Sequence, residues 1–203
     1  MKRFDCLKVI ESFMTDEDIV VANVGNTSLE WHTIRPSPAN LYNVNLGQCT
    51  PVGLGLALAL PTRRVMAFDG DGNVLLNLAS LADAAYLRPS NFRIIVFDNQ
   101  AYESPGCLPT ATAHGTDLEA IAKGAGIKKT LTIRSLEEFV NKIQLVFNEK
   151  EFCLVVAKIE TGTVGTRPIN MDGKRNKYQF ATYIEDTEKK PVLRLRSQSP
   201  LVE

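Results

Sequence analysis

Short runs of β-branched and aromatic residues alternate along this chain with segments of helical periodicity. The runs lie at residues 19–23, 64–68, 93–97, 130–133 and 152–157. They lack a clean alternation of apolar and polar residues, which is typical of strands covered by helices on both faces. Strands separated by helical segments form parallel sheets with crossover helices. We therefore predict an α/β fold with an open, doubly wound, mostly parallel sheet.

Three of the helical segments between these runs carry recognisable N-terminal signals. Thr50 is followed by Pro51, which suits an N-cap and the first turn of a helix. Residues 116–119 and 135–138 fit the capping box, in which a hydroxyl side chain and a later glutamate satisfy backbone N–H groups. We expect helices to start at these three points, and a further helix over about residues 74–86.

The length of 203 residues is enough for one domain with a substantial core and a tail. We predict a single domain over residues 1–160. Beyond about residue 161 the composition shifts toward Gly, Pro, Arg and Lys, so we expect residues 161–203 to be a C-terminal arm or tail. An arm that contacts a partner and a disordered tail both remain open.

The charge balance bears on which partners the chain binds. Lys and Arg together number 23, as do Asp and Glu, so no uniform basic field is present to attract nucleic acid or an anionic membrane. The longest apolar stretch, residues 52–60, is too short to cross a bilayer. Residues 1–5 lead into an amphipathic segment and not into the apolar core of a signal peptide. We expect a cytoplasmic protein that binds neither nucleic acid nor membranes.

The cysteines and histidines limit the kinds of metal site that are possible. The cysteines are Cys6, Cys49, Cys107 and Cys153, and the histidines are His32 and His114. The wide spacing of the cysteines, without a C-x-x-C pair, argues against a zinc knuckle or a disulfide framework, and we expect reduced thiols. Two histidines exclude a multi-histidine site. A metal ion would need oxygen ligands, which favours Mg²⁺ or Ca²⁺.

Polar residues follow two consecutive predicted strands at the points where those strands end. The run at 64–68 leads into Asp-Gly-Asp-Gly-Asn at 69–73, and the run at 93–97 leads into Asp-Asn-Gln-Ala-Tyr at 98–102. Parallel neighbouring strands have their carboxyl ends on the same edge of a sheet, where ligands of open α/β folds bind. We therefore expect the side chains at these two strand ends to converge.

The residue types at this edge suit a magnesium ion that carries a phosphorylated cofactor. Asp71, Asn99 and a backbone carbonyl would supply three hard oxygen ligands, and Mg²⁺ takes its remaining ligands from phosphate and water. Gly70 and Gly72 would allow the backbone to approach the phosphate closely. A helix beginning near Asn73 would add N–H groups for anionic oxygens.

The pairing of Gly70-Asp71-Gly72 with Asp98-Asn99 resembles the metal motif of the thiamin-diphosphate-dependent enzymes. The resemblance covers roughly residues 18–159. Within that family, the segments at 40–49, 53–59, 75–82 and 98–104 look like the diphosphate-binding domain of sulfopyruvate and phosphonopyruvate decarboxylases. The pattern is most similar to the short beta subunits of sulfopyruvate decarboxylase, which carry this domain alone. The resemblance thus implies thiamin diphosphate and Mg²⁺ as cofactors.

The resemblance also implies roles for individual residues. Asp71 and Asn99 would bind Mg²⁺ through their side chains, and Ala101 through its backbone oxygen. The residues implied to contact the cofactor are Gly47, Gln48, Cys49, Gly70, Gly72, Asn73, Ala101 and Tyr102.

One position departs from the family pattern. The family loop Gly-Ser-Met/Ile-Gly corresponds to residues 47–50, where the carbonyl of Gly47 would contact the aminopyrimidine and position 49 would support the bent cofactor. Cys49 replaces a bulky apolar residue there, and the smaller side chain would change how tightly the protein holds the cofactor in its bent shape. We interpret Cys49 as a small buried apolar side chain and not as a reactive thiol.

The resemblance further implies a reaction and a partner. Enzymes of this family decarboxylate small 2-oxo acids, with the cofactor as electron sink, and a glutamate on a pyrimidine-binding domain assists. No such domain fits beside the one predicted here, so the resemblance implies a separate subunit that supplies the glutamate. At least two of each chain would assemble. No argument connects Glu30, Glu103 or Glu119 with that role.

Candidate substrate contacts are less well defined. Three polar residues follow the predicted metal-binding segment at 98–102 and would suit the substrate pocket, namely Ser104, Thr110 and His114. A solvated or capping role is more usual for a histidine such as His114. Arg35 and Arg167 would suit a sulfonate or phosphonate but are interpreted as surface residues.

The sequence also bears on alternative functions. A phospho-receiver would need an acidic cluster at residues 23–26, and a dinucleotide-binding enzyme would need three glycines, whereas the pair at 53–55 lies in a predicted helix. Two alternatives on the same cofactor stay open. One is a carboligase or acyl-transfer subunit resembling acetolactate synthase, and the other is a catalytically silent, regulatory cofactor-binding subunit.

Overall fold

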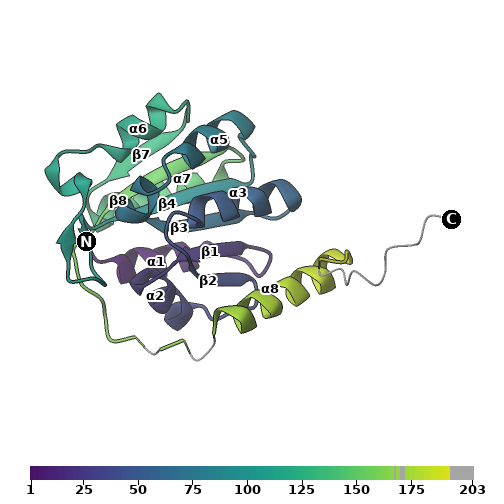
Figure 1. Ribbon diagram of the computed structural model, residues 1–203. Helices are drawn as coiled ribbons and strands as arrows, with labels where there is room; N and C mark the ends of the chain where they lie inside the picture. Colours follow the sequence, from purple (N-terminus) through teal and green to yellow (C-terminus); the bar gives the residue numbers. More distant parts are fainter. Residues whose placement is uncertain (167, 170–171, 193–203) are drawn as a thin grey trace.

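A computed structural model describes residues 1–166, 168–169 and 172–192, and a six-stranded sheet organises them (Figure 1). The strand order is β2-β1-β3-β4-β8-β7, and every neighbouring pair is parallel. The strands are β1 (Ile19–Asn23), β2 (Asn40–Val44), β3 (Val65–Gly70), β4 (Phe92–Asp98), β7 (Thr130–Ile133) and β8 (Cys153–Lys158). The predicted open parallel α/β fold is confirmed.

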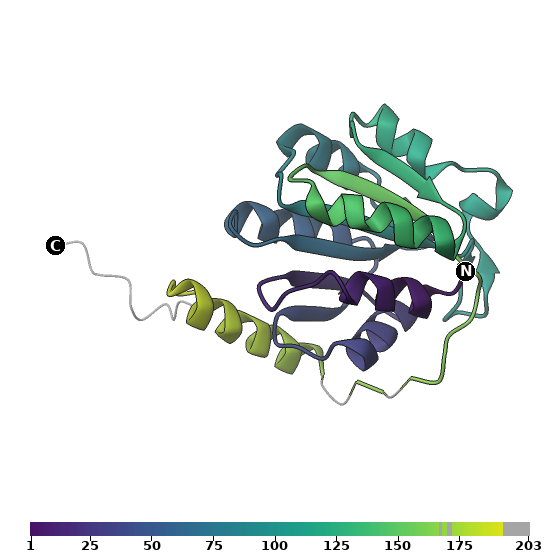
Figure 2. The ribbon, with the colours of Figure 1, turned by 180° about the vertical axis from the view of Figure 1, so that it is seen from behind.

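Helices cover both faces of this sheet (Figures 1 and 2). One face carries α1 (Arg3–Glu11), α2 (Asn26–Ile34) and α7 (Leu136–Asn148). The other carries α3 (Cys49–Ala59), α5 (Ala79–Leu87), α6 (Leu118–Gly124) and α8 (Gly173–Glu188). The short elements α4 (Asp71–Leu75), η1 (Ala111–His114) and an antiparallel hairpin of β5 (Ala101–Tyr102) and β6 (Leu108–Pro109) lie near the carboxyl edge.

The two helical layers explain why the strands read as continuous apolar runs. Val65 and Ala67 of β3 pack into the core beneath α3 and α5, whereas Met66 and Phe68 pack into the core beneath α1 and α2. Successive strand residues point to opposite faces, so a sheet buried on both sides needs apolar residues at every position.

The predicted strands agree closely with the observed ones, apart from one edge strand. β1 and β7 have the predicted bounds, and β3 and β4 extend further, to Gly70 and Asp98. The strand β2 was not predicted. Its residues alternate between buried and more exposed positions, and it contains Asn40 and Asn43, a residue type that is depleted in strands.

The helix starts match the predictions only in part. Ser135 caps α7, because its hydroxyl accepts from the backbone N–H of Glu138 at 3.2 Å. The prediction for α6 was shifted by one residue, because the carboxylate of Asp117 is the cap.

Two further helix predictions were wrong in detail. The helix α3 begins at Cys49, so the hydroxyl of Thr50 does not cap it and donates instead to Asp69 at 2.7 Å. The helix expected over residues 74–86 is divided into α4 and α5, and α4 begins at Asp71 and not near Asn73.

Residues 173–188 form the helix α8, whereas an arm or tail was predicted for this part of the chain. The helix packs along the edge strand β2 (Figure 1). Asn176 accepts from the backbone N–H of Tyr42 at 2.8 Å and donates to the carbonyl of Asn40 at 3.1 Å. The mostly polar composition concealed the buried stripe formed by Asn176, Phe180 and Ile184. Contact with a partner remains a prediction.

Among the described helices, none combines the length and the apolar character that crossing a bilayer would require.

Replacing Asn176 with alanine should destabilise the protein. The substitution would leave a buried N–H and a buried carbonyl of β2 without partners, and we expect the free energy of unfolding to fall by about 2 kcal/mol. Urea denaturation would measure the change. Gln179→Ala, at an exposed position of the same helix, is the matched control. Equal effects of the two substitutions would contradict the stabilising role assigned to the hydrogen bonds between Asn176 and β2.

Candidate functional site

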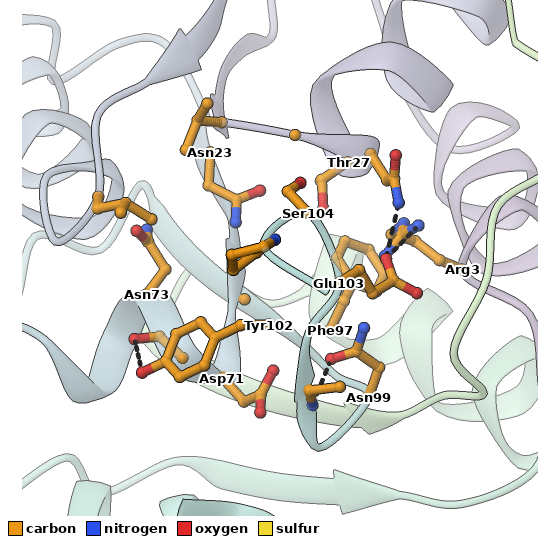
Figure 3. A pocket seen from close by; sticks show the side chains of 18 residues that line it. Arg3, Asn23, Thr27, Asp71, Asn73, Phe97, Asn99, Tyr102, Glu103 and Ser104 are labelled. Carbon is orange, nitrogen blue, oxygen red and sulfur yellow. Dashed lines mark hydrogen bonds and ion pairs between the residues drawn. The ribbon is translucent and has the colours of Figure 1, made fainter. Parts of the chain in front are cut away.

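A cavity of about 470 Å³ opens at the carboxyl ends of β1, β3 and β4 (Figure 3). The chain passes from β1 to β2 on one side and later returns to β3 on the other, so the cavity lies at a topological switch point, the usual ligand site of open α/β sheets. Its lining comes from residues at and after the ends of these strands, together with Leu46 after β2 and Arg3 of α1. The lining residues are Arg3, Asn23, Val24, Gly25, Asn26, Thr27, Leu46, Gly70, Asp71, Gly72, Asn73, Phe97, Asn99, Ala101, Tyr102, Glu103, Ser104 and Pro105.

The structure brings the three predicted metal ligands to this one cavity. Asp71 is the first residue of α4, directly after β3, and its side chain is buried. Asn99 follows β4, and its amide oxygen accepts from the backbone N–H of Ala101 at 3.1 Å. The carboxylate, the amide and the neighbouring backbone form a set of hard oxygen donors that suits Mg²⁺.

The pKa of the Asp71 carboxyl is raised above its ordinary value, although burial and hydrogen bonds act on it in opposite directions. Burial raises its pKa, and hydrogen bonds from the hydroxyls of Thr110 and Thr112 lower it, while the charge of Asp98 raises it further. A carboxylate that is costly to ionise in a buried site gains stabilisation from a nearby cation. The electrostatics therefore fit a bound metal ion as well as the donor set does.

Gly72 and Tyr102 are held against each other across the two loops. The Tyr102 hydroxyl donates to the carbonyl of Gly72 at 3.4 Å (Figure 3). A Cβ atom at position 72 would lie under 3.0 Å from the Tyr102 ring, so only glycine fits there. Glycine is therefore required where the loop at residues 69–73 meets the Tyr102 ring, and both residues line the cavity.

Hydrogen bonds join the loop at Gly47 to the loop at residues 69–73, named the metal loop for its predicted ligand Asp71. Asn73 donates to Asp69 and accepts from the backbone N–H of Gly47 at 2.7 Å. Asn77 donates to the carbonyl of Gly47 at 2.9 Å. Gly47 has a φ of 73°, a conformation that favours glycine. Its backbone is thus held from both sides.

The loop around Gly47 reaches the cavity through one residue, and the cofactor contacts implied for this loop remain predictions. Leu46 lines the cavity, whereas Gly47, Gln48 and Cys49 are not part of its lining. Cys49 is fully buried between α3 and the sheet, where its thiol donates to the carbonyls of Val21 and Phe68. Burial raises the pKa of the Cys49 thiol well above its ordinary value, as expected for an inert core residue. Its support of the bent cofactor stays a prediction.

The predicted substrate contacts are separated in space. Ser104 lines the cavity close to Gly25. His114 lies exposed at the end of η1 and is not part of the lining. Arg35 pairs with Glu11 and Asp16 away from the cavity. Arg167 lies outside the described residues.

Sequence reasoning missed the contribution of the segment that follows β1. Asn23 is 8% exposed, and its side-chain oxygen has no hydrogen-bond partner among the described residues. Figure 3 shows its amide directed into the cavity. Buried polar atoms are rarely left unpaired, so this oxygen indicates a ligand. The position of Asn23 at the end of a third parallel strand was the signal that could have revealed it.

Arg3 and Glu103, which line the cavity, belong to a cluster of charged side chains that also includes Glu30. Arg3 donates to Glu30 at 2.9 Å and to Glu103 at 3.4 Å, and Asn26 donates to Glu103 at 2.8 Å. Burial raises the pKa of Glu103, but the hydrogen bonds from Asn26 and the backbone of Gly162, with the charge of Arg3, hold it below its ordinary value. Both glutamates are therefore committed to structural ion pairs.

Comparison with known proteins identifies the class to which this site belongs. Residues 23–157 match the family described as "Thiamine pyrophosphate enzyme, C-terminal TPP binding domain". The chain belongs to this family of thiamin diphosphate-binding domains, and the resemblance seen in the sequence is confirmed.

Individual relatives narrow the comparison. The chain is 38% identical over 158 residues to the beta subunit of sulfopyruvate decarboxylase from Methanocaldococcus jannaschii, covering 77% of this chain and 83% of that one. It is 31% identical over 181 residues to the sulfopyruvate decarboxylase of Methanosarcina acetivorans, covering 89% of this chain but 46% of the other.

Solved structures support the fold. The structure of benzoylformate decarboxylase from Polynucleobacter necessarius matches with a TM-score of 0.65 and 20% identity, over 83% of this chain. The chain spans about a third, 34%, of that protein's length.

Replacing Gly72 with alanine should disturb the site. The added methyl group would push the Tyr102 ring away, which we expect to cost about 1–3 kcal/mol of stability and to weaken thiamin diphosphate binding. Thermal unfolding with and without the cofactor would measure both effects. Gly55→Ala is the control, because a Cβ there meets no atom within 4 Å. Unchanged cofactor binding in the Gly72 variant would contradict the assigned contact.

Proposed function

We propose that this chain is the Mg²⁺- and thiamin diphosphate-binding subunit of a two-subunit 2-oxo acid decarboxylase, similar to sulfopyruvate and phosphonopyruvate decarboxylases. The observation that carries the proposal is the convergence of Asp71, Asn99 and Ala101 on one cavity. The similarity to the beta subunit from Methanocaldococcus jannaschii supports the reaction class. Sulfopyruvate and phosphonopyruvate share an acidic group beyond the 2-oxo acid, and the choice between them is left to the experiment.

The residues of the cavity fit both parts of the cofactor's head. Asp71 and Asn99 would bind Mg²⁺ with their side chains, and Ala101 with its carbonyl. The backbone around Gly72, with Tyr102 against it, would contact the diphosphate. When bound, thiamin diphosphate supplies the nucleophilic carbon and the electron sink for loss of carbon dioxide from a 2-oxo acid.

The chain's own contribution is binding, orientation and the exclusion of water. The metal loop and the loop at Gly47 are joined by buried hydrogen bonds through Asn73, so both would meet the cofactor in a fixed relation. Phe97 and Leu46 give part of the cavity an apolar wall. A low-dielectric wall strengthens the electrostatic contacts made inside the site. Ser104 is the proposed contact for the substrate.

The proton-transfer glutamate is proposed to come from a partner subunit. Glu30 and Glu103 are both paired with Arg3, and Glu119 pairs with Lys123 on α6 outside the cavity. Of the described glutamates near the cavity, neither is free to serve as a proton carrier.

The rim of the cavity supports the same proposal. Two of the lining residues, Val24 and Leu46, expose apolar side chains to solvent. Exposed apolar side chains grouped around a functional site are typical of an interface. The partner is therefore proposed to cover the mouth of the cavity and to supply the glutamate there. A hetero-oligomer with at least two copies of each chain is expected.

Activity measured with and without the partner would test the proposal. The chain should be purified with its native partner, supplied with Mg²⁺ and thiamin diphosphate, and offered sulfopyruvate, phosphonopyruvate and pyruvate. We expect carbon dioxide release that depends on both subunits and both cofactors. Full turnover by this chain alone would contradict the two-subunit proposal. Acyloin formation would favour a carboligase, and cofactor binding without any turnover would favour a regulatory subunit.

Replacing Asn99 with alanine should disable the assembled enzyme. The loss of one of three protein ligands should lower turnover by roughly 100-fold and weaken Mg²⁺ binding, because outer partners alone are worth 10-fold or more. Steady-state assays over a range of Mg²⁺ concentrations would show the change. Asn141→Ala, which removes an exposed amide on α7, is the control. Wild-type Mg²⁺ dependence in the Asn99 variant would rule out this ligand.

A further inference from the structure

Two buried hydroxyl groups hold the Asp71 carboxylate from the side away from the cavity. The hydroxyl of Thr110 donates to Oδ2 of Asp71 at 2.5 Å, and that of Thr112 lies 3.0 Å from the same oxygen. The two hydroxyls are themselves 2.8 Å apart. Both threonines are buried, and neither lines the cavity.

The segment with Thr110 and Thr112 is also hydrogen-bonded to the loop that follows β4, at residues 98–101. The Thr112 hydroxyl donates to Oδ1 of Asp98 at 2.9 Å. The side chain of Gln100 donates to the carbonyl of Thr112 at 3.1 Å, and the backbone N–H of Thr110 donates to the carbonyl of Gln100 at 3.0 Å. The threonines thus connect the loop that carries Asp71 with the loop that carries Asn99. In the second loop they contact Asp98 and Gln100, the two neighbours of Asn99.

The hairpin explains how the threonines reach this place. Ala101 pairs with Pro109 in the β5–β6 ladder, so the chain returns directly beneath the loop that it has just left. Thr110 is the next residue. The hairpin therefore delivers the hydroxyls to the back of the metal site at a fixed distance from Asn99.

The hydrogen bonds orient the charge of Asp71 without neutralising it. The contacts from the two threonine hydroxyls both go to Oδ2, so neither hydroxyl occupies Oδ1. The two hydroxyls have one proton each to share between two carboxylates. Asp98 is fully buried and has its own counter-charge in Lys158, the residue opposite it on β8. The second carboxylate therefore does not need the metal ion, whereas Asp71 does.

We propose that Thr110 and Thr112 are positioning residues for the magnesium ion. They turn the Asp71 carboxylate so that Oδ1 faces the cavity, and they set the separation of the Asp71 and Asn99 loops before the ion binds. This inference rests on the proposed function of the site. Loss of a partner that orients a metal ligand typically lowers metal affinity or activity by about 10-fold to 100-fold.

The test compares two substitutions at position 112 in the complex of the full chain with its partner. Thr112→Val keeps the shape of the side chain and removes the hydroxyl, whereas Thr112→Ser keeps the hydroxyl. Calorimetry at saturating thiamin diphosphate would give the dissociation constant of Mg²⁺. We expect Thr112→Val to weaken Mg²⁺ binding by roughly 10-fold to 100-fold, with Thr112→Ser close to wild type.

Two further measurements separate positioning from a general loss of structure. At saturating Mg²⁺, kcat of Thr112→Val should stay within a few-fold of wild type. Thermal unfolding without cofactors would report any loss of stability. Thr33→Val, which removes an exposed hydroxyl on α2, is the matched control and should change nothing. A variant too unstable to assay would be replaced by Thr110→Ser and Thr110→Val, judged by the same criteria.

The outcomes distinguish the inference from the function on which it rests. If the wild-type complex shows no Mg²⁺-dependent binding of thiamin diphosphate, both the proposed function and this inference are overturned. If the wild type binds but Thr112→Val binds Mg²⁺ equally well, the inference alone is wrong. Equal weakening in Thr112→Val and Thr112→Ser would also overturn it, because the hydroxyl would then not matter.

Discussion

Parallel hydrogen bonding between β1, β3 and β4 is the constraint on which the site depends. In the observed register Gly70 lies opposite Phe97, and Ala22 lies opposite Phe68. The segments that leave these strands therefore start about one strand spacing, roughly 5 Å, from their neighbours. An antiparallel pairing would send one of the segments to the other end of the sheet. The cavity and its donor atoms follow from this shared direction.

The site also depends on how three buried aspartates are satisfied. A buried carboxylate is costly unless it is paired or hydrogen-bonded. Asp69 accepts from Thr50 and Asn73 and so joins the loops around the cavity, and Asp98 is paired with Lys158. Asp71 accepts from the hydroxyls behind it and from the backbone of Gly72. It is the carboxylate with the least compensation, and it is the one that faces the cavity.

The open cavity gives a physical reason for the proposal that this chain binds the cofactor and a partner chain supplies the proton-transfer group. Gripping a diphosphate through a metal ion requires rigid loops on a sheet edge, which one chain provides. Moving a proton at the reactive end requires an ionisable group whose charge is not already used, and Glu30 and Glu103 have theirs committed to Arg3. The exposed apolar side chains of Val24 and Leu46, which line the cavity, would be stabilised by a partner that covers them. A site shared between two chains would satisfy both needs.

The relation between sequence and structure differs from one element to another. The strands at β1 and β7, the cap at Ser135 and the meeting of Asp71 with Asn99 at one cavity could all be predicted from local patterns. The edge strand β2 and the helix α8 could not be predicted, because each has only a weak apolar pattern in the sequence. Contacts between the two elements hold them in place, and a local pattern does not show such contacts.

The sequence by itself determined the class of fold and the positions of the proposed metal-binding motif, since apolar periodicity and the residues that end a strand are local properties of the chain. Only the tertiary structure decided which side chains support that motif. Thr110 behind Asp71, Arg3 beside Glu103 and Cys49 in the core are contacts between residues far apart in the chain. No local pattern encodes such contacts, because they arise from the way the hairpin, the first helix and the sheet pack together.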